Sequence, residues 1–329
     1  MKNERLAERA FELLKRKSER ALEMTRKAIF EEKMSKETQE ALEYYLKTWE
    51  DTTRPGILSL AHEAVGGKPE KIVPLQVALQ CIAAAMDIYD DLIDKSIIKG
   101  TEQTLYGRFG SEMALLLGSA FLVKGFNKLY ESIENLTHER KKWIVESVDN
   151  FLFEVINAHI LEVKLRTKKW HVKPEEYLSI LEKKAADIEG RMRIGAIFGG
   201  GSLQEITALS KYGRNLGILL AIRSEFIDIY EKHELMNRIK HECLPLPVLY
   251  ALQNTIHKNK IRKILSKKEF GENEIEELLE TVYQTAEISR LKQLLNKLEI
   301  EAKYTLNYLQ VDKAKDDFRL LLSSMLEDL

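Results

Sequence analysis

The sequence predicts an all-α protein, a single domain over residues 1–329 built from long antiparallel helices. Apolar residues recur at three- and four-residue spacing through most of the chain, which is the period of a helix. The six prolines leave residues 75–173, 175–244 and 248–329 without proline. Runs of alternating β-branched residues, which would indicate strands, are missing. The inner helices are too apolar for a simple surface-type bundle, so we expect a large helical core.

The periodic segments give the expected helices in chain order. They cover residues 5–32, 36–50, 75–94, 111–134, 138–167, 174–199, 204–232, 247–264 and 273–308. Glycines and a proline at 66–69 predict a turn, and Pro174 suits the first residue of a helix with an acidic opening turn. The glycines at 199–201 end that helix. Asn273 with Glu276 resembles a capping box at the start of the last segment.

Composition limits the function classes. The 329 residues are 44% hydrophobic and carry a net charge of −1, which gives no electrostatic case for nucleic acid or an anionic membrane as a partner. No stretch of about 20 uninterrupted apolar residues exists, so no membrane span is expected. The N-terminus has no signal-peptide core, and the two cysteines lie far apart. These features predict a cytoplasmic protein.

Four aspartates at 87–94 follow an almost wholly apolar run at 77–86. Asp87, Asp91 and Asp94 stand at i, i+4 and i+7, and Asp90 lies beside them, so all four are expected on or near one helix face. Buried carboxylates this close repel one another and stay partly protonated unless a cation separates them. Mg²⁺ suits such oxygen ligands, with a phosphate completing its coordination shell.

The alternative for these aspartates is a solvated helix end whose carboxylates pair with Lys95 and Lys99. The spacing alone leaves both interpretations open.

A second acidic pair, Glu225 and Asp228, follows another apolar run about 130 residues later. If the two acidic helices face each other across a cavity, they could hold metal ions between them. A diphosphate bound there would have its charge neutralised, so its C–O bond to an allylic carbon could ionise. The apolar remainder of the cavity would shelter the carbocation from water. Alternatively, the pair is a partner of Arg223 and Lys232.

A series of motifs, taken in order, resembles the trans-isoprenyl diphosphate synthases, the polyprenyl synthetase family. The matching positions are Thr53-Arg54-Pro55, Ala64-Val65-Gly66-Gly67, Asp90-Asp91-Leu92-Ile93-Asp94, Phe109-Gly110, Ala114-Leu115-Leu116-Leu117-Gly118, Lys183, Gly195-Ala196, Ile222-Arg223 with Asp228, and Leu246-Pro247 with Leu249-Tyr250-Ala251-Leu252. The resemblance covers about residues 45–255. It implies an isoprenoid-synthase-type bundle of long antiparallel helices around a deep central cavity, usually a homodimer. It also implies three Mg²⁺ ions between two aspartate-rich motifs, binding an allylic prenyl diphosphate.

The resemblance assigns roles to individual residues. Asp90, Asp91 and Asp94 match the first aspartate-rich motif and would be catalytic metal ligands, and Asp228 matches the last aspartate of the second motif. Lys183 matches the lysine that contacts the allylic diphosphate.

Two further positions are less determined. Glu162, after His159, falls where the family often has an acidic residue opposite the first motif, or else it is a surface partner of Lys164 or Arg166. Asp87 has no counterpart in the motif.

Other positions depart from the family pattern. In the second motif Ala221 replaces a glutamine, and Ser224 and Glu225 replace two aspartates, although Glu225 could still bind a metal ion. The basic pair after the first motif is missing, with Lys99 as the one candidate replacement. The basic segment that binds isopentenyl diphosphate keeps Arg54 alone.

The predicted substrate-binding residues are therefore Arg54, Lys99, Lys183 and Arg223. Each lost charge-assisted phosphate contact costs roughly 1.5–3 kcal/mol, so the site for isopentenyl diphosphate should be severely weakened. This favours a class I, terpene-synthase-like enzyme that ionises an allylic diphosphate without isopentenyl diphosphate. Two alternatives remain open: a prenyltransferase using isopentenyl diphosphate or another acceptor, and a weakly catalytic regulatory subunit that forms a heterodimer with an active synthase.

Two residues just before the first motif are predicted to form the cavity floor. Ala85 is small and Met86 could fill part of the space. Such a floor leaves room for a prenyl tail of about C20 or longer. A tight helix–helix contact explains the alanines equally well.

Overall fold

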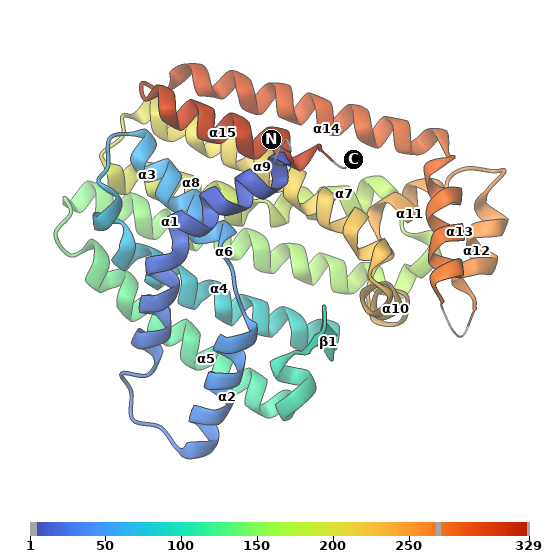
Figure 1. The fold of residues 1–329 in the computed structure, drawn as a ribbon, viewed down its shortest axis with the longest axis horizontal. Helices are drawn as coiled ribbons and strands as arrows, with labels where there is room; N and C mark the ends of the chain where they lie inside the picture. The colour runs from blue at the N-terminus through green and yellow to red at the C-terminus, as the bar shows by residue number, and fades with distance from the viewer. Residues whose placement is uncertain (1–4, 268–270, 328–329) are drawn as a thin grey trace.

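The computed structural model describes residues 5–267 and 271–327. It confirms the all-α prediction (Figure 1). The elements in chain order are α1 (Leu6–Ile29), α2 (Lys36–Thr48), α3 (Thr53–Ala64), η1 (Pro69–Lys71), α4 (Val73–Asp94), β1 (Ile98–Lys99), β2 (Glu102–Gln103), α5 (Leu105–Ile133), α6 (His138–Leu165), η2 (Arg166–His171), α7 (Pro174–Lys184), α8 (Ala186–Gly199), α9 (Leu203–Tyr230), α10 (Lys232–His241), α11 (Leu246–Ala251), α12 (Lys258–Leu265), α13 (Glu272–Tyr283), α14 (Ala286–Thr305), η3 (Leu306–Tyr308) and α15 (Asp312–Met325).

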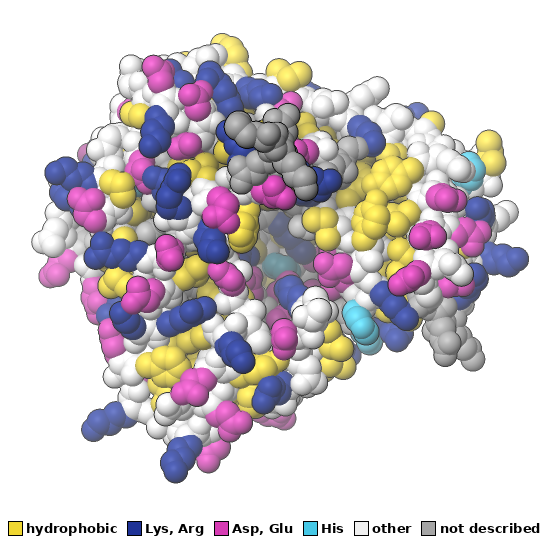
Figure 2. Space-filling model, viewed as in Figure 1, with side chains coloured by type: hydrophobic (Ala, Val, Ile, Leu, Met, Phe, Trp, Pro, Cys, Tyr) yellow, Lys and Arg dark blue, Asp and Glu magenta, His cyan; other side chains and the backbone are white. Residues whose placement is uncertain are grey.

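Helix α4 runs through the interior, as its apolar sequence predicts. It packs along α5 on one side and against α1 on another, while α8 packs against α3, α6 and α9. Figure 1 shows α14 and α15 running along one edge of the molecule, with α10 to α13 gathered at one end. Helices α3, α4, α6, α8 and α9 surround a central space that opens on the face in Figure 2, where acidic, basic and histidine side chains lie inside a hollow.

Several predicted helices are divided in the structure. The segment 174–199 forms α7 and α8, which meet at Ala185. Helix α9 approaches this junction so closely that a Cβ atom added to Gly217 would lie 2.9 Å from the carbonyl oxygen of Ala185. Likewise 247–264 forms α11 and α12, and 273–308 forms α13, α14 and η3.

Other elements were not predicted. Helix α3 is almost wholly buried, so its twelve residues show no amphipathic pattern. Helix α5 begins six residues before the predicted segment 111–134, and Gly110, with φ of +85°, marks a kink within it. The strands β1 and β2 form a two-residue antiparallel pair between α4 and α5.

One helix of the described residues, α5, is long and apolar enough to cross a membrane by length and composition. It contacts α4 extensively, which accounts for the apolar residues on that side. One third of its most apolar 18-residue window is buried, so several large apolar side chains of α5 remain exposed.

The two ends of the described chain meet at one carboxylate. The backbone N–H groups of Leu6 and Ala7 donate to the two carboxylate oxygens of Glu327, at 2.9 and 2.7 Å. These N–H groups belong to the first turn of α1, where no intrahelical acceptor exists. Helices α1 and α15 also pack against each other. The first helix is thus capped by the segment that follows the last helix.

Candidate active site

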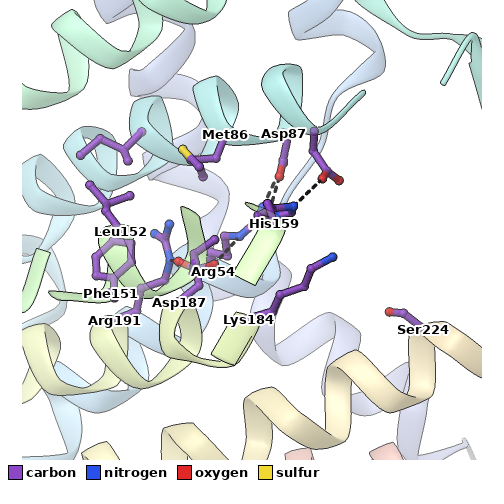
Figure 3. A pocket seen from close by; sticks show the side chains of 14 residues that line it. Arg54, Met86, Asp87, Phe151, Leu152, His159, Lys184, Asp187, Arg191 and Ser224 are labelled. Atoms are coloured by element: carbon purple, nitrogen blue, oxygen red, sulfur yellow. Dashed lines mark hydrogen bonds and ion pairs between the residues drawn. The ribbon is translucent and has the colours of Figure 1, made fainter. Parts of the chain in front are cut away.

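A polar cavity of about 330 Å³ lies between α3, α4, α6, α7, α8 and α9. Figure 3 shows side chains from these helices directed toward one another. Its charged and titratable lining consists of Arg54, Asp87, Asp90, His159, Lys184, Asp187 and Arg191. Ile82, Ala83 and Met86 extend the same face of α4. The apolar sequence of α4 fixes this helix in the core and thereby brings Asp87 and Asp90 to the cavity.

Asp90, Asp91 and Asp94 each have a separate partner. Asp90 Oδ1 lies 3.2 Å from His159 Nδ1, and Asp91 Oδ1 lies 3.3 Å from Lys99 Nζ. Asp94 forms an ion pair with Arg166. The alternative interpretation, a solvated helix end, predicted the contact between Asp91 and Lys99. However, the side chains of Asp90, Asp91 and Asp94 are only 12–35% exposed, so the end of α4 is not fully solvated.

Burial perturbs these carboxyl groups. It raises the pKa of Asp91 to about 6, against the opposing charge of Lys99 and with the help of Asp90. It also raises the pKa of Asp94 to about 8, with further contributions from Asp90 and Glu242. Burial in the low-dielectric interior is the main cause of both shifts, and the neighbouring carboxylates add to it.

The first motif therefore has the chemistry of a cation site. Asp90 Oδ1 is buried and receives no hydrogen bond, and burial and Lys184 lower the pKa of its neighbour His159. A neutral imidazole does not neutralise the carboxylate. Within residues 5–267 and 271–327, no three Asp, Glu, His or Cys side chains are already arranged as a metal-ion site. The carboxylate oxygens of the first motif are suitable ligands for Mg²⁺. For Asp91 and Asp94 to bind it, their ion pairs with Lys99 and Arg166 must first break.

The raised pKa values predict pH-dependent metal binding. A carboxyl group must lose its proton to bind a cation, so Mg²⁺ affinity should rise by up to about tenfold per pH unit below pH 6 through Asp91, and should go on rising up to pH 8 if Asp94 is also a ligand. Isothermal titration calorimetry across this range would measure it. An affinity that stays constant from pH 5.5 to 8.5 would contradict the prediction.

The second acidic pair, Glu225 and Asp228, was predicted to bind a metal ion, but its carboxylates contact protein donors instead. Glu225 is 4% exposed, and both of its carboxylate oxygens are occupied. Tyr177 Oη donates to Oε1 at 2.9 Å, while Arg238 Nη2 and the Leu246 N–H donate to Oε2 at 2.6 and 2.8 Å. Arg238 also lies 3.2 Å from Asp228. Glu225 is thus satisfied by protein donors and is not directed at an open site.

In the described part of the chain, these two carboxylates pair with a residue other than Arg223 and Lys232. Arg223 donates a hydrogen bond to the carbonyl oxygen of Ser324 in α15, and it does not line the polar cavity. Glu225 and Asp228 instead pair with Arg238, which the sequence analysis did not identify. Glu234 and Arg238 of α10 and Glu242 directly after it are spaced four residues apart, a charge pattern that could have indicated Arg238.

The lysine in the cavity is Lys184, and Lys183 is not part of the lining. Lys184 Nζ lies 2.6 Å from Glu162 Oε2. Glu162 is 1% exposed, so it is not a surface partner of Lys164 or Arg166. Burial opposes ionisation of Glu162, but Lys184 and Arg238 overcome this and lower its pKa to about 2.

Arg54 reaches the cavity but is surrounded by carboxylates. Its guanidinium lies 3.1 Å from Asp51, 2.9 Å from Asp87 and 2.8 Å from Asp187. Trp49 Nε1 also donates to Asp87, at 3.0 Å. Asp87 therefore has a defined role: it holds Arg54 in the cavity wall. The positive charge of Arg54 is already compensated within the protein.

An apolar groove of about 900 Å³ adjoins the polar cavity. It lies between α4, α5 and α6, and four residues line both spaces: Met86, Asp90, Leu152 and His159. Met86 thus stands at the junction, in agreement with its predicted place in the cavity. Ala85 does not line either space, because it is fully buried among Tyr45, Phe121 and other residues of α2 and α5.

Comparisons with known proteins agree with this architecture. The family model of polyprenyl synthetase matches residues 35–282. The chain is 30% identical to the short chain isoprenyl diphosphate synthase of Methanothermobacter thermautotrophicus over 77% of this chain and 78% of that protein. It is 27% identical to the geranylgeranyl diphosphate synthase of Methanosarcina mazei, over 78% of this chain and 79% of the relative.

The fold has close structural counterparts. The geranylgeranyl pyrophosphate synthetase of Pyrococcus horikoshii superposes with a TM-score of 0.82 over 97% of this chain and 98% of that chain, at 24% identity. The polyprenyl synthetase of Streptomyces coelicolor also gives 0.82, over 96% and 99% of the two chains, at 19% identity. The family match and these relatives show that the chain belongs to the polyprenyl synthetase family of Mg²⁺-dependent isoprenoid synthases.

Proposed function

We propose that this protein is a prenyltransferase that binds an allylic prenyl diphosphate and forms an isoprenyl diphosphate. The observation that carries the proposal is the direct connection between the polar cavity and the apolar groove through Met86, Asp90, Leu152 and His159. A diphosphate headgroup matches the first space, and a prenyl chain matches the second. Relatives described as isoprenyl and geranylgeranyl diphosphate synthases support the same assignment.

The roles of the residues follow from their positions. Asp90 and Asp91 would hold Mg²⁺, and Lys184 would contact the diphosphate in place of Lys183. Bound Mg²⁺ would supply positive charge that stabilises the departing diphosphate. The apolar walls would exclude water from the allylic carbon. Three ions would require both acidic motifs, but Asp94 pairs with Arg166 and Glu225 with Arg238.

A terpene-synthase-like activity is the second candidate, favoured by Arg54. This residue is the one retained from the segment that binds isopentenyl diphosphate, and three carboxylates already compensate its charge. A second diphosphate placed beside Asp51, Asp87 and Asp187 would be repelled. An enzyme with that defect would convert the allylic diphosphate alone.

One experiment separates these functions. Purified protein with Mg²⁺ is incubated with C10, C15 and C20 allylic diphosphates, each with and without isopentenyl diphosphate, while products and released diphosphate are followed. Longer prenyl diphosphates formed only with isopentenyl diphosphate would support the prenyltransferase. Turnover without it would support the terpene-synthase activity. Activity that requires an added synthase would identify a regulatory subunit and overturn both.

Met86 provides a test of the prenyl-chain site. Met86→Trp should narrow the passage between the two cavities and shift the products toward shorter chains, because the larger ring fills the junction. Product lengths would be compared by chromatography. Ala85→Val is the matched control: it should lower stability by about 1–3 kcal/mol through overpacking and leave product length unchanged. A change of product length in the Ala85 variant alone would reverse this assignment.

We also propose that the protein is a homodimer formed through the exposed apolar side chains of α5 and α6. Leu116 and Val123 of α5 are 67% and 62% exposed, and Phe153 and Ile160 of α6 are 74% and 50% exposed. Exposed apolar groups concentrated on neighbouring helices are typical of protein interfaces. A second copy would also cover the open side of the apolar groove.

Leu116→Glu should therefore produce a monomer, because a carboxylate buried in an apolar interface would have no partner. Sedimentation velocity would measure the change in mass. Ile256→Glu, at an 81% exposed position outside α5 and α6, should leave the oligomeric state unchanged. A wild-type monomer would refute the proposed interface.

A further inference from the structure

Three carboxylates converge on one buried guanidinium at the α9–α10 side of the site. Arg238 Nη2 lies 2.6 Å from Glu225 Oε2, while Nη1 lies 3.2 Å from Asp228 Oδ2 and 3.7 Å from Glu242 Oε2. The side chain of Arg238 is 7% exposed, and those of Glu225 and Glu242 are each 5% exposed. The cation at the centre of this acidic cluster is therefore part of the protein.

Arg238 and Glu225 already have several hydrogen-bond partners each. Arg238 Nε donates to the Cys243 carbonyl oxygen at 3.0 Å, and Nη2 also donates to Tyr177 Oη at 2.9 Å. Glu225 accepts from Tyr177, Arg238 and the Leu246 N–H. A Mg²⁺ ion needs carboxylate oxygens at about 2.0–2.1 Å in octahedral geometry. Glu225 could bind one only by losing these donors and bringing two cations together.

The first acidic group differs at Asp90 and Asp91, although its third aspartate, Asp94, is paired with Arg166. Asp90 Oδ1 receives no hydrogen bond, and its nearest basic group is His159. The Lys99 side chain beside Asp91 is 65% exposed, so it can move into solvent when a metal ion arrives. Asp90 and Asp91 can therefore accept a cation, whereas Glu225, Asp228 and Glu242 already share the guanidinium of Arg238.

We propose that Arg238 takes the place of a metal ion in the Glu225, Asp228 and Glu242 cluster, so that divalent cations bind at the α4 aspartates alone. Arg238 acts as a positioning residue: it fixes the α9 carboxylates and the chain before α11 around the cavity. The inference rests on the proposed function, because it concerns the metal ions of the same site. Its test counts bound ions and needs no turnover, so it can fail while prenyl transfer stands.

The test is a count of bound Mn²⁺ ions by electron paramagnetic resonance, with inorganic diphosphate present. Asp90→Asn should lower the number of bound ions, whereas Asp228→Asn should leave it unchanged. Both variants remove one carboxylate charge without changing side-chain size, so each is the control for the other. Loss of bound Mn²⁺ in Asp228→Asn would overturn the proposal.

A second pair of variants tests the guanidinium itself. Arg238→Gln should bind one more Mn²⁺ ion than the wild type, and the Arg238→Gln/Asp228→Asn double variant should lose it again. The same count in wild type and folded Arg238→Gln would overturn the role of Arg238. If Arg238→Gln does not fold, the comparison of Asp90→Asn with Asp228→Asn still decides whether the second cluster binds metal.

Discussion

Asp90→Asn is expected to lower the rate of diphosphate release from an allylic substrate by about 10³-fold, or about 4 kcal/mol of transition-state stabilisation. Asp90 is the first-motif aspartate that lines both the polar cavity and the apolar groove. Loss of its charge would remove a metal ligand at the point where the headgroup meets the prenyl chain. The amide has nearly the same shape, so the fold should be retained.

Single-turnover measurements at saturating Mg²⁺ would give the rate, and circular dichroism would confirm folding. Asp316→Asn on α15 is the control, because that side chain is 76% exposed and pairs with Arg319 in a surface contact. A rate within threefold of the wild type would show that Asp90 does not serve the reaction.

Arg238→Met is expected to lower the free energy of unfolding by about 3–5 kcal/mol, because it leaves buried carboxylates without their cation. Urea denaturation at pH 7 would measure the loss. The surface variant Arg319→Met, whose side chain is 53% exposed in its ion pair, should change stability by no more than about 0.5 kcal/mol. A loss of less than about 1 kcal/mol in Arg238→Met would show that the carboxylates of Glu225, Asp228 and Glu242 do not need this cation for stability.

The effect should also depend on pH in a defined direction. Burial raises the pKa of Asp228 to about 7, against the opposing charge of Arg238, and burial raises the pKa of Glu242 to about 7 in the same way. Raised carboxyl pKa values mean that the folded state binds more protons than the unfolded state between about pH 4 and 7. Stability from these groups is therefore greatest below pH 4 and falls as pH rises to 7.

Removing Arg238 takes away the charge that opposes these shifts, so the pKa values should rise further. Arg238→Met should consequently recover part of its lost stability as the pH is lowered from 8 to 6, because protonation removes the unpaired charges. Denaturation at three pH values would show the recovery. An equal difference from the wild type at every pH would assign the loss to packing alone.

The sequence predicted most accurately those features that depend on a single helix. The apolar run before Asp90 placed α4 in the core, and the spacing of the aspartates placed them near one face. Where two neighbouring residues could serve, the pattern did not choose between them: Met86 reaches the cavities as predicted but Ala85 does not, and Lys184 lines the polar cavity where Lys183 was predicted. Successive residues of a helix point about 100° apart, and a motif match does not fix which one faces inward.

Contacts between distant segments were harder to predict. Arg238 forms hydrogen bonds with Glu225 and Tyr177 because α7, α9 and α10 lie close together in the fold. The periodicity of any single segment does not predict such a contact. Helix α15 is a different case. Its buried residues Ala314, Phe318, Leu321 and Leu322 follow helical spacing, so the signal was present in the sequence and was overlooked.

The cap on α1 has a consequence for how the chain folds during synthesis. The Leu6 N–H and its Glu327 acceptor are 321 residues apart, and α1 also packs on α15. At about 5–20 residues per second, a ribosome needs on the order of tens of seconds to make that stretch. Until α15 has emerged, α1 therefore lacks the acceptor for its Leu6 and Ala7 N–H groups, and the side that packs on α15 is uncovered. A chaperone that holds nascent chains would have that long to bind it.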